Sequence, residues 1–171
     1  VEYYEKTVFE GATFADLRAA GKPVVVINAS DLGGGVRFSF LQGYFDLLCS
    51  DLSTFPVARA VTASSAVPIL FSPVVLKNYP ECSSRAADYL ARFKTEDSTV
   101  QIQQAVNGLK SYADKETRQY IHLVDGGITD NLGLMAIYEM VGVAGGIRPF
   151  IRQTAGKPGK QFLLIVVDAS T

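Results

Sequence analysis

An aspartate followed by two glycines, Asp125-Gly126-Gly127, is the part of this sequence best suited to chemistry. It directly follows Tyr120–Val124, which we predict to be a β-strand. Glycine permits a sharp turn and leaves room for a substrate to approach. A carboxylate at the end of a strand is placed to act as a base or to orient another group. Because Asp-Gly is also common in ordinary turns, a plain turn residue is the alternative interpretation.

Other acids stand near predicted strand ends. Asp168 ends the apolar run Phe162–Val167, and ligands of open α/β sheets bind beyond the carboxyl ends of the strands. Asp130-Asn131 lies just after the glycines, where we predict an N-cap for the following helix. A calcium or magnesium site built from Asp125, Asp130 and Asn131 lacks the spacing of an EF-hand loop.

The sequence offers no matching nucleophile. None of the twelve serines has a glycine two positions before it, which the G-x-S-x-G elbow of hydrolases requires. Cys49 and Cys82 have neither such a glycine nor a nearby base. His122 is the one histidine and lies inside a predicted strand, where packing against a helix explains it better than a Ser-His-Asp triad. Without another usable histidine a triad hydrolase is disfavoured, so a two-residue mechanism fits better.

Two further patterns have structural explanations. Cys49 and Cys82 form no CxxC motif, so they do not indicate a zinc site, and one disulfide between them is compatible with an oxidising compartment. Gly33–Gly35 lacks the GxxxxGK[ST] pattern of a phosphate loop, and we predict a hairpin turn over Asp31–Gly35. The small residues of Ala63–Pro73 fit ordinary helix packing and the close approach of a ligand equally well.

The hydrophobic pattern predicts an α/β protein with helices covering a mostly parallel sheet, because continuous apolar runs suit strands buried on both faces. We expect strands at Pro23–Asn28, Val36–Phe40, Val74–Leu76, Tyr120–Val124 and Phe162–Asp168. We expect helices at Thr13–Ala20, Tyr44–Leu48, Pro56–Ala66, Ser84–Phe93, Ser98–Tyr112 and Leu132–Val141, and a loop at Arg148–Lys160. The first helix opens with a capping-box pattern of Thr13 and Asp16 and is closed by Gly21, and apolar residues recur at helical spacing in Ser98–Tyr112, at Ile102, Ala105, Val106 and Leu109. The last third then forms a βαβ unit with a right-handed crossover.

Composition agrees with one globular domain. The 171 residues are 48% hydrophobic and carry a net charge of -1, so nothing favours a nucleic-acid partner. No apolar run approaches the ~20 residues that a transmembrane helix needs.

Four segments resemble the C-terminal part of bacterial patatin-like phospholipases, and they follow one another in the same order as in that family. The clearest is HLVDGGITDNLGL, His122–Leu134, which is similar to the family's D-G-[GA] motif followed by an asparagine and a hydrophobic helix. The other matching segments are Pro23–Phe40, Phe55–Leu76 and Phe162–Ser170. A stretch at about 84–119 has no counterpart and reads as a variable helical insertion within the one domain, 1–171.

The resemblance implies a three-layer α/β/α fold with a mostly parallel central sheet, incomplete on its N-terminal side. It also implies a Ser-Asp dyad that hydrolyses lipid carboxylic esters without a cofactor or metal, in which Asp125 is the acid. The serine elbow and the oxyanion loop would lie upstream of Val1, so we expect this chain alone to be inactive. The implied partners are a lipid or phospholipid substrate, a membrane surface and the missing N-terminal part of the domain. The implied setting is membrane-peripheral or exported, in a bacterium.

Three other hypotheses remain open. The chain could be a non-catalytic module that binds lipid or a protein partner. It could be a structural α/β domain in which Asp125 is only a turn residue. It could also be a metal-dependent hydrolase that uses Asp125, Asp130 and Asp168.

Overall fold

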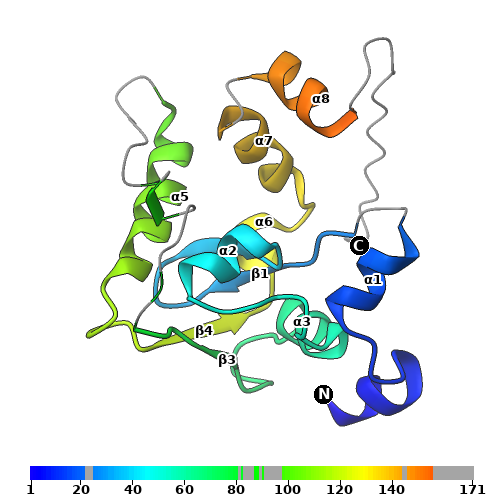
Figure 1. Cartoon of the computed structure of the whole chain (residues 1–171). Helices are drawn as coiled ribbons and strands as arrows, with labels where there is room; N and C mark the ends of the chain where they lie inside the picture. Colours follow the sequence, from blue (N-terminus) through cyan, green and yellow to red (C-terminus); the bar gives the residue numbers. More distant parts are fainter. Residues whose placement is uncertain are drawn as a thin grey trace.

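The computed structural model describes residues 1–21, 25–80, 98–143 and 146–155, together with residues 82, 87, 88 and 90. In chain order its elements are η1 (Tyr4–Val8), α1 (Phe14–Ala20), β1 (Asn28–Asp31), β2 (Val36–Ser39), α2 (Gln42–Leu47), α3 (Val57–Ser64), β3 (Val74–Lys77), α5 (Val100–Lys110), η2 (Ser111–Ala113), β4 (Tyr120–Val124), α6 (Gly127–Asp130), α7 (Leu134–Val143) and α8 (Ile147–Ala155). In the view of Figure 1, α5 lies to the left of the small sheet, α1 and α3 lie to the right, and α6 leads up to α7; α1, α3 and α5 all contribute to the one hydrophobic core.

The four strands form one sheet in the order β2-β1-β4-β3, and every neighbouring pair is antiparallel. β1 returns into β2 through the predicted glycine-rich hairpin, with Ala29 opposite Phe38. The hairpin prediction is therefore confirmed. The prediction of a three-layer α/β/α fold with a mostly parallel central sheet is wrong, because the described chain has a small antiparallel sheet with helices.

The prediction of a parallel sheet rested on continuous apolar runs, of which the first is Pro23–Asn28. Strand β1 begins only at Asn28, and Val25–Ile27 lie outside any strand. Strands β3 and β4 alternate buried and exposed residues, as antiparallel strands do when one face meets solvent, whereas parallel strands are buried on both faces. The other apolar run, Phe162–Asp168, and with it the predicted βαβ unit, lies outside the described residues.

One face of the sheet carries the hydrophobic core. The register places Ala29, Phe38, Leu123, Ile121 and Leu76 on this face, and all five are buried. A cluster of aromatic rings packs against it, with ring centroids 5.3–6.3 Å apart: Phe14, Phe38, Phe40, Tyr44, Phe45, Phe55 and Tyr112. Burial of these large aromatic side chains stabilises the fold.

The opposite face is divided into two halves. On β3 and β4 it is open, and Val75, Tyr120 and His122 are exposed. On β1 and β2 it is polar and buried, with Ser30 opposite Arg37 under the chain of α6 and α7. The buried polar half therefore lies next to the turn that follows β4.

Two helix predictions are confirmed in detail. Helix α1 begins with the predicted capping box, in which the Thr13 backbone N–H donates to Asp16 Oδ2 over 2.8 Å, and it ends at Gly21 with φ of +85°. The pattern in Ser98–Tyr112 corresponds to α5 and the short helix η2. Ile102 and Val106 point into the core as the spacing predicts.

One loop prediction is wrong. Ile147–Ala155 forms helix α8, although the polar, proline-containing segment was expected to be irregular. Pro149 lies in the first turn, where its missing N–H would have no helical partner in any case. The predicted helix Ser84–Phe93 lies largely outside the described residues, although residues 87, 88 and 90 are helical.

Cys49 and Cys82 form a disulfide, which ties the end of α2 to the segment after β3. Among the described residues, no helix is both long enough and apolar enough to cross a lipid bilayer.

Candidate functional site

The turn at Asp125 is anchored to the end of helix α3. The Asp125 N–H donates to the carbonyl of Ala66 over 2.9 Å, and the Gly126 N–H donates to the carbonyl of Ser64 over 3.1 Å. Both carbonyls lie where α3 stops, so the small residues there allow the turn to lie directly against the helix end. The position of Asp125 is thus set by β4 on one side and by α3 on the other.

Gly126 packs directly on strand β1. A Cβ atom at Gly126 would lie 2.8 Å from the carbonyl oxygen of Asn28, closer than any side chain tolerates. The Ser30 hydroxyl donates to the Asp125 carbonyl over 2.8 Å and also lies 2.8 Å from Thr129 Oγ1. The glycine in the second position is therefore required by the close contact between two backbones.

The carboxylate of Asp125 is half-buried and only partly engaged. Its Oδ1 accepts a hydrogen bond of 2.7 Å from the Gly127 N–H at the start of α6. Within the described part of the chain, no group hydrogen-bonds to Oδ2. One oxygen thus fixes the orientation of the carboxylate, and the other is free to accept a proton or hold a hydroxyl group.

The neighbouring acid has a structural role. Asp130 Oδ2 accepts a hydrogen bond of 2.8 Å from the Ala136 N–H, in the first turn of α7. Asp130 therefore helps to cap the following helix, although α7 begins at Leu134 and not directly after Asp130-Asn131 as predicted. The Asn131 side chain lies close to the turn, with its Oδ1 3.0 Å from where a Cβ of Gly127 would be.

The remaining predicted candidates do not join this site. His122 is exposed on β4 and not packed against a helix as expected, and no described hydrogen bond links its side chain to Asp125. Asp168 lies outside the described residues. No described serine hydroxyl hydrogen-bonds to the Asp125 carboxylate, since Ser30 bonds to its backbone carbonyl. No three His, Cys, Asp or Glu side chains of the described residues are grouped as metal ligands.

A second acidic site went unnoticed in the sequence. Asp31 ends β1 and is 1% exposed, and its carboxylate accepts hydrogen bonds from the Tyr112 hydroxyl (3.0 Å), Arg118 (2.5 Å) and the Gly33 N–H (3.1 Å). Burial, followed by the adjacent Asp31 charge, raises the pKa of Tyr112 well above its usual range. This closed network holds the β1–β2 hairpin to η2.

A buried ion pair was also missed. Arg37 on β2 pairs with Glu139 on α7 and also donates to Ser39 and to Asn28 Oδ1. Burial raises the pKa of Glu139, and the charge of Arg37 opposes that rise. Because 102 positions separate the two partners, no local pattern links them.

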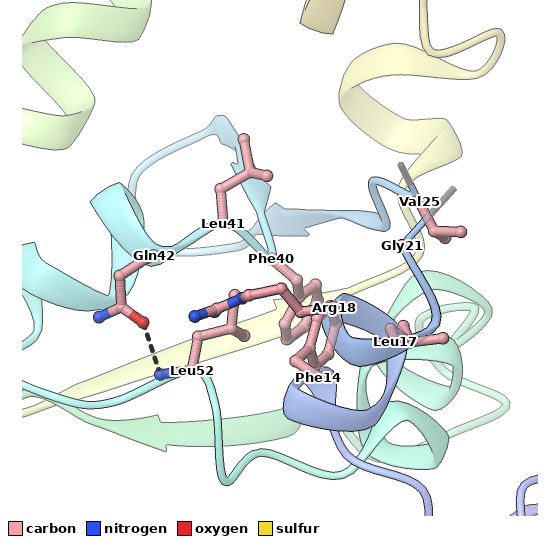
Figure 2. A pocket seen from close by; sticks show the side chains of 9 residues that line it. All are labelled: Phe14, Leu17, Arg18, Gly21, Val25, Phe40, Leu41, Gln42 and Leu52. Carbon is pink, nitrogen blue, oxygen red and sulfur yellow. Dashed lines mark hydrogen bonds between the residues drawn. The ribbon is translucent and has the colours of Figure 1, made fainter. Parts of the chain in front are cut away.

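The described residues line several cavities, and Asp125 lines none of the following three. The one in Figure 2 has a volume of about 180 Å³ between α1 and the β2–α2 connection, and a hydrogen bond from the Leu52 N–H to Gln42 Oε1 closes one side. A cavity of about 270 Å³ lies between α2, α5 and α7, and one of about 420 Å³ lies beside the disulfide.

Comparisons with protein-family models, with curated proteins and with solved structures found no match to this chain.

Proposed function

We propose that this chain supplies the catalytic aspartate, Asp125, of a Ser-Asp dyad that hydrolyses lipid carboxylic esters, as in patatin-like phospholipases. One observation carries the proposal: three segments that resemble the family meet at this turn. Asn28 and Ser30 come from the first segment, Ser64 and Ala66 from the second, and the D-G-G turn from the third. The antiparallel sheet adds nothing to this argument, which rests on the residues of the turn and their contacts.

Asp125 would accept the hydroxyl proton of the serine, or hold that hydroxyl in line, while the serine oxygen attacks the ester carbonyl. The alcohol leaves with a proton, an acyl-enzyme remains, and water then releases the fatty acid. The serine and the oxyanion amides would come from a G-x-S-x-G segment and a glycine-rich loop outside these 171 residues. Each oxyanion donor typically contributes about 3 kcal/mol to stabilising the transition state.

The segment after Ala66 supports a lipid surface as partner. Ile69, Leu70 and Phe71 are largely exposed, directly after the residue whose carbonyl holds the Asp125 N–H. From Phe55 to Pro80 the sequence has two basic residues, Arg59 and Lys77, and no acidic residue. An exposed apolar tip without negative charge suits a membrane surface. The same tip would serve a non-catalytic lipid-binding or partner-binding domain, which is the alternative function.

The test is Asp125→Asn in the complete protein that carries this chain together with its serine elbow. Hydrolysis of p-nitrophenyl dodecanoate should fall by on the order of 10³-fold or more, as for other acids of catalytic units. Asp130→Asn is the matched control, because an asparagine still caps α7. An unchanged rate for Asp125→Asn would leave Asp125 as a turn residue, and loss of activity with a chelator would favour the metal-dependent hydrolase.

A second experiment treats the 171-residue chain with a fluorophosphonate, which labels activated serines, and measures the intact mass. We expect no adduct, because no serine here lies on an elbow. An adduct would show that one of the twelve serines is activated and would refute the assignment of the nucleophile to another segment. A complete protein without any G-x-S-x-G elbow would favour the non-catalytic binding domain.

A further inference from the structure

The cavity between α2, α5 and α7 is apolar along most of its wall. It has a volume of about 270 Å³, clearly larger than the ~150 Å³ of an engineered apolar cavity that holds one benzene. Its aliphatic lining comes from Leu41, Leu47, Leu90, Ile102, Val106 and Met140. Such a wall offers no hydrogen bonds, so it suits a hydrocarbon chain.

The polar part of the wall is a single spot. Arg37, Tyr44 and Glu139 all line the cavity and contact one another: Arg37 pairs with Glu139, and its guanidinium carbon lies 5.9 Å from the centre of the Tyr44 ring. A chain in the cavity would therefore meet polar groups at one place only. The polar end of a ligand would therefore bind at this place.

This spot holds an unsatisfied donor. The Arg37 side chain is 4% exposed, its two terminal nitrogens are bonded to Ser39, Asn28 and Glu139, and its Nε has no partner within the described part of the chain. A buried donor without a partner costs about 1–3 kcal/mol. Because Nε is itself fully buried, a ligand in the cavity would meet the ion pair and the Tyr44 side chain that line it, and not this nitrogen.

The charge balance selects the kind of oxygen. Arg37 is already neutralised by Glu139, so a carboxylate at this place would be repelled by Glu139 without a free cation to offset it. An ester carbonyl or an alcohol accepts a hydrogen bond without adding charge. The spot therefore fits an uncharged polar group.

The polar spot is also close to the candidate catalytic turn. Arg37 lies opposite Ser30 in the β1–β2 ladder, and the Ser30 hydroxyl donates to the carbonyl of Asp125. Arg37 also donates to Asn28 Oδ1, while the carbonyl of Asn28 packs on Gly126. On its other side the cavity shares Leu47, Leu90 and Leu109 with the cavity of about 420 Å³ beside the disulfide, which gives a longer chain room to extend.

We infer that this cavity binds an acyl chain of an uncharged lipid ester, with the ester group beside the neutral polar spot formed by Arg37, Tyr44 and Glu139. The choice of an ester rests on the proposed function. The observations on the cavity and its neutral polar spot do not depend on the proposed function. The binding site is distinct from Asp125, so each can be tested while the other is intact.

The experiment measures binding of methyl octanoate and of octanoate to the full chain at pH 7, by methyl shifts in two-dimensional NMR. We expect saturable binding of the ester, with shifts at Ile102, Val106 and Met140, and at least tenfold weaker binding of octanoate. Ala105 lines the cavity, so Ala105→Phe should fill it and weaken ester binding at least tenfold. Gln104→Phe, on the exposed side of the same helix, is the control and should bind within twofold of the unchanged chain.

Ala105→Glu gives a second disruption that places a charge in the cavity without adding an aromatic ring, in case the larger side chain disturbs folding. Absence of saturable ester binding, or binding that neither substitution at Ala105 weakens, would overturn the site. Equal affinity for octanoate and its methyl ester would overturn the uncharged ligand. Asp125→Asn should bind the ester unchanged, so loss of the proposed hydrolysis and loss of this binding are separate results.

Discussion

Two acids in this molecule share one sequence pattern and have different surroundings. Asp31 is the last residue of β1 and Asp125 comes directly after β4, and each is followed closely by glycines. Asp31 is buried and accepts three hydrogen bonds, from Tyr112, Arg118 and Gly33. Asp125 is half-buried and accepts one, from Gly127.

The difference separates a structural acid from the proposed catalytic acid. A carboxylate whose donors are all supplied by the protein and which no solvent reaches has no capacity left for a substrate. A carboxylate with one fixed and one free oxygen is oriented and still available. The number of donors and the exposure of the acid, which depend on residues distant in sequence, therefore decide its role.

The largest expected effect comes from removing the buried acid. Asp31→Ala leaves Arg118 without its carboxylate, and breaking a buried pair in this way costs about 3–5 kcal/mol. Because the Arg118 side chain is 17% exposed and can reach solvent, we expect about 3 kcal/mol. Asp125→Ala removes one surface hydrogen bond and should cost less than ~1 kcal/mol. Urea unfolding followed by circular dichroism measures both losses.

Similar losses for the two substitutions would break the comparison, because Asp125 would then also be a structural residue. Asp31→Asn tests the comparison between the two aspartates further. An asparagine keeps the shape of the side chain but presents an NH₂ group to donors, so part of the loss should remain.

The next effect concerns the Tyr112 hydroxyl. Hydrogen bonds to charged groups contribute about 1.5–3 kcal/mol, so Tyr112→Phe should lower the free energy of unfolding by about 2 kcal/mol. Tyr138→Phe is the control, because its hydroxyl is exposed and bonds to the neutral Thr99 side chain over 3.2 Å. A loss as small as that of the control would show that the hydrogen bonds from Arg118 and Gly33 are enough to stabilise the buried Asp31 carboxylate.

The same hydroxyl predicts a pH dependence. The raised pKa of Tyr112 means that the folded state keeps a proton that the unfolded state releases above about pH 10. Stability should therefore fall as the pH rises above 10, and Tyr112→Phe should reduce this slope. Some slope should remain, because burial also raises the pKa of Tyr44.

A glycine beside each acid gives a third comparison. A Cβ at Gly34 would lie 2.5 Å from Asp31 Oδ2, and a Cβ at Gly127 would lie 3.0 Å from Asp125 Oδ1. Asp31 is held by three hydrogen bonds and cannot move, so Gly34→Ala should cost about 1–3 kcal/mol through overpacking. Asp125 is held by one hydrogen bond and needs to shift by only a few tenths of an ångström, so Gly127→Ala should cost less than ~1 kcal/mol. Thermal unfolding of the two variants would contradict this view if their order were reversed.

The local sequence was enough for some elements. The capping box at Thr13, the helical spacing in Ser98–Tyr112 and the hairpin at Asp31–Gly35 all appear where their patterns predict them, because each depends on residues a few positions apart. The turn at Asp125 was found for the same reason, and so was the cap at Asp130.

The sheet and the roles of the acids depend on partners distant in the chain. Continuous apolar residues in Pro23–Asn28 predicted a parallel strand, but the strand that forms begins at Asn28 and pairs antiparallel with both neighbours. The donors of Asp31 include Tyr112 and Arg118, which lie 81 and 87 positions away. No periodicity within one segment carries that information, so a buried acid and a half-exposed acid had the same appearance in the sequence.

The smallest effect tests how the turn at Asp125 is held. Ser30→Ala removes the hydroxyl that donates to the Asp125 carbonyl and should cost about 1 kcal/mol, the usual net contribution of one neutral hydrogen bond. The backbone bonds from the turn to Ala66 and Ser64 remain, so the fold should persist while the turn loosens. Faster amide exchange at Gly126 and Gly127, with unchanged exchange at Gly35 in the β1–β2 hairpin, would show that the effect is local to the candidate site. Equal acceleration at Gly35 would mean that Ser30 stabilises the whole sheet and that the two acidic regions are not independent.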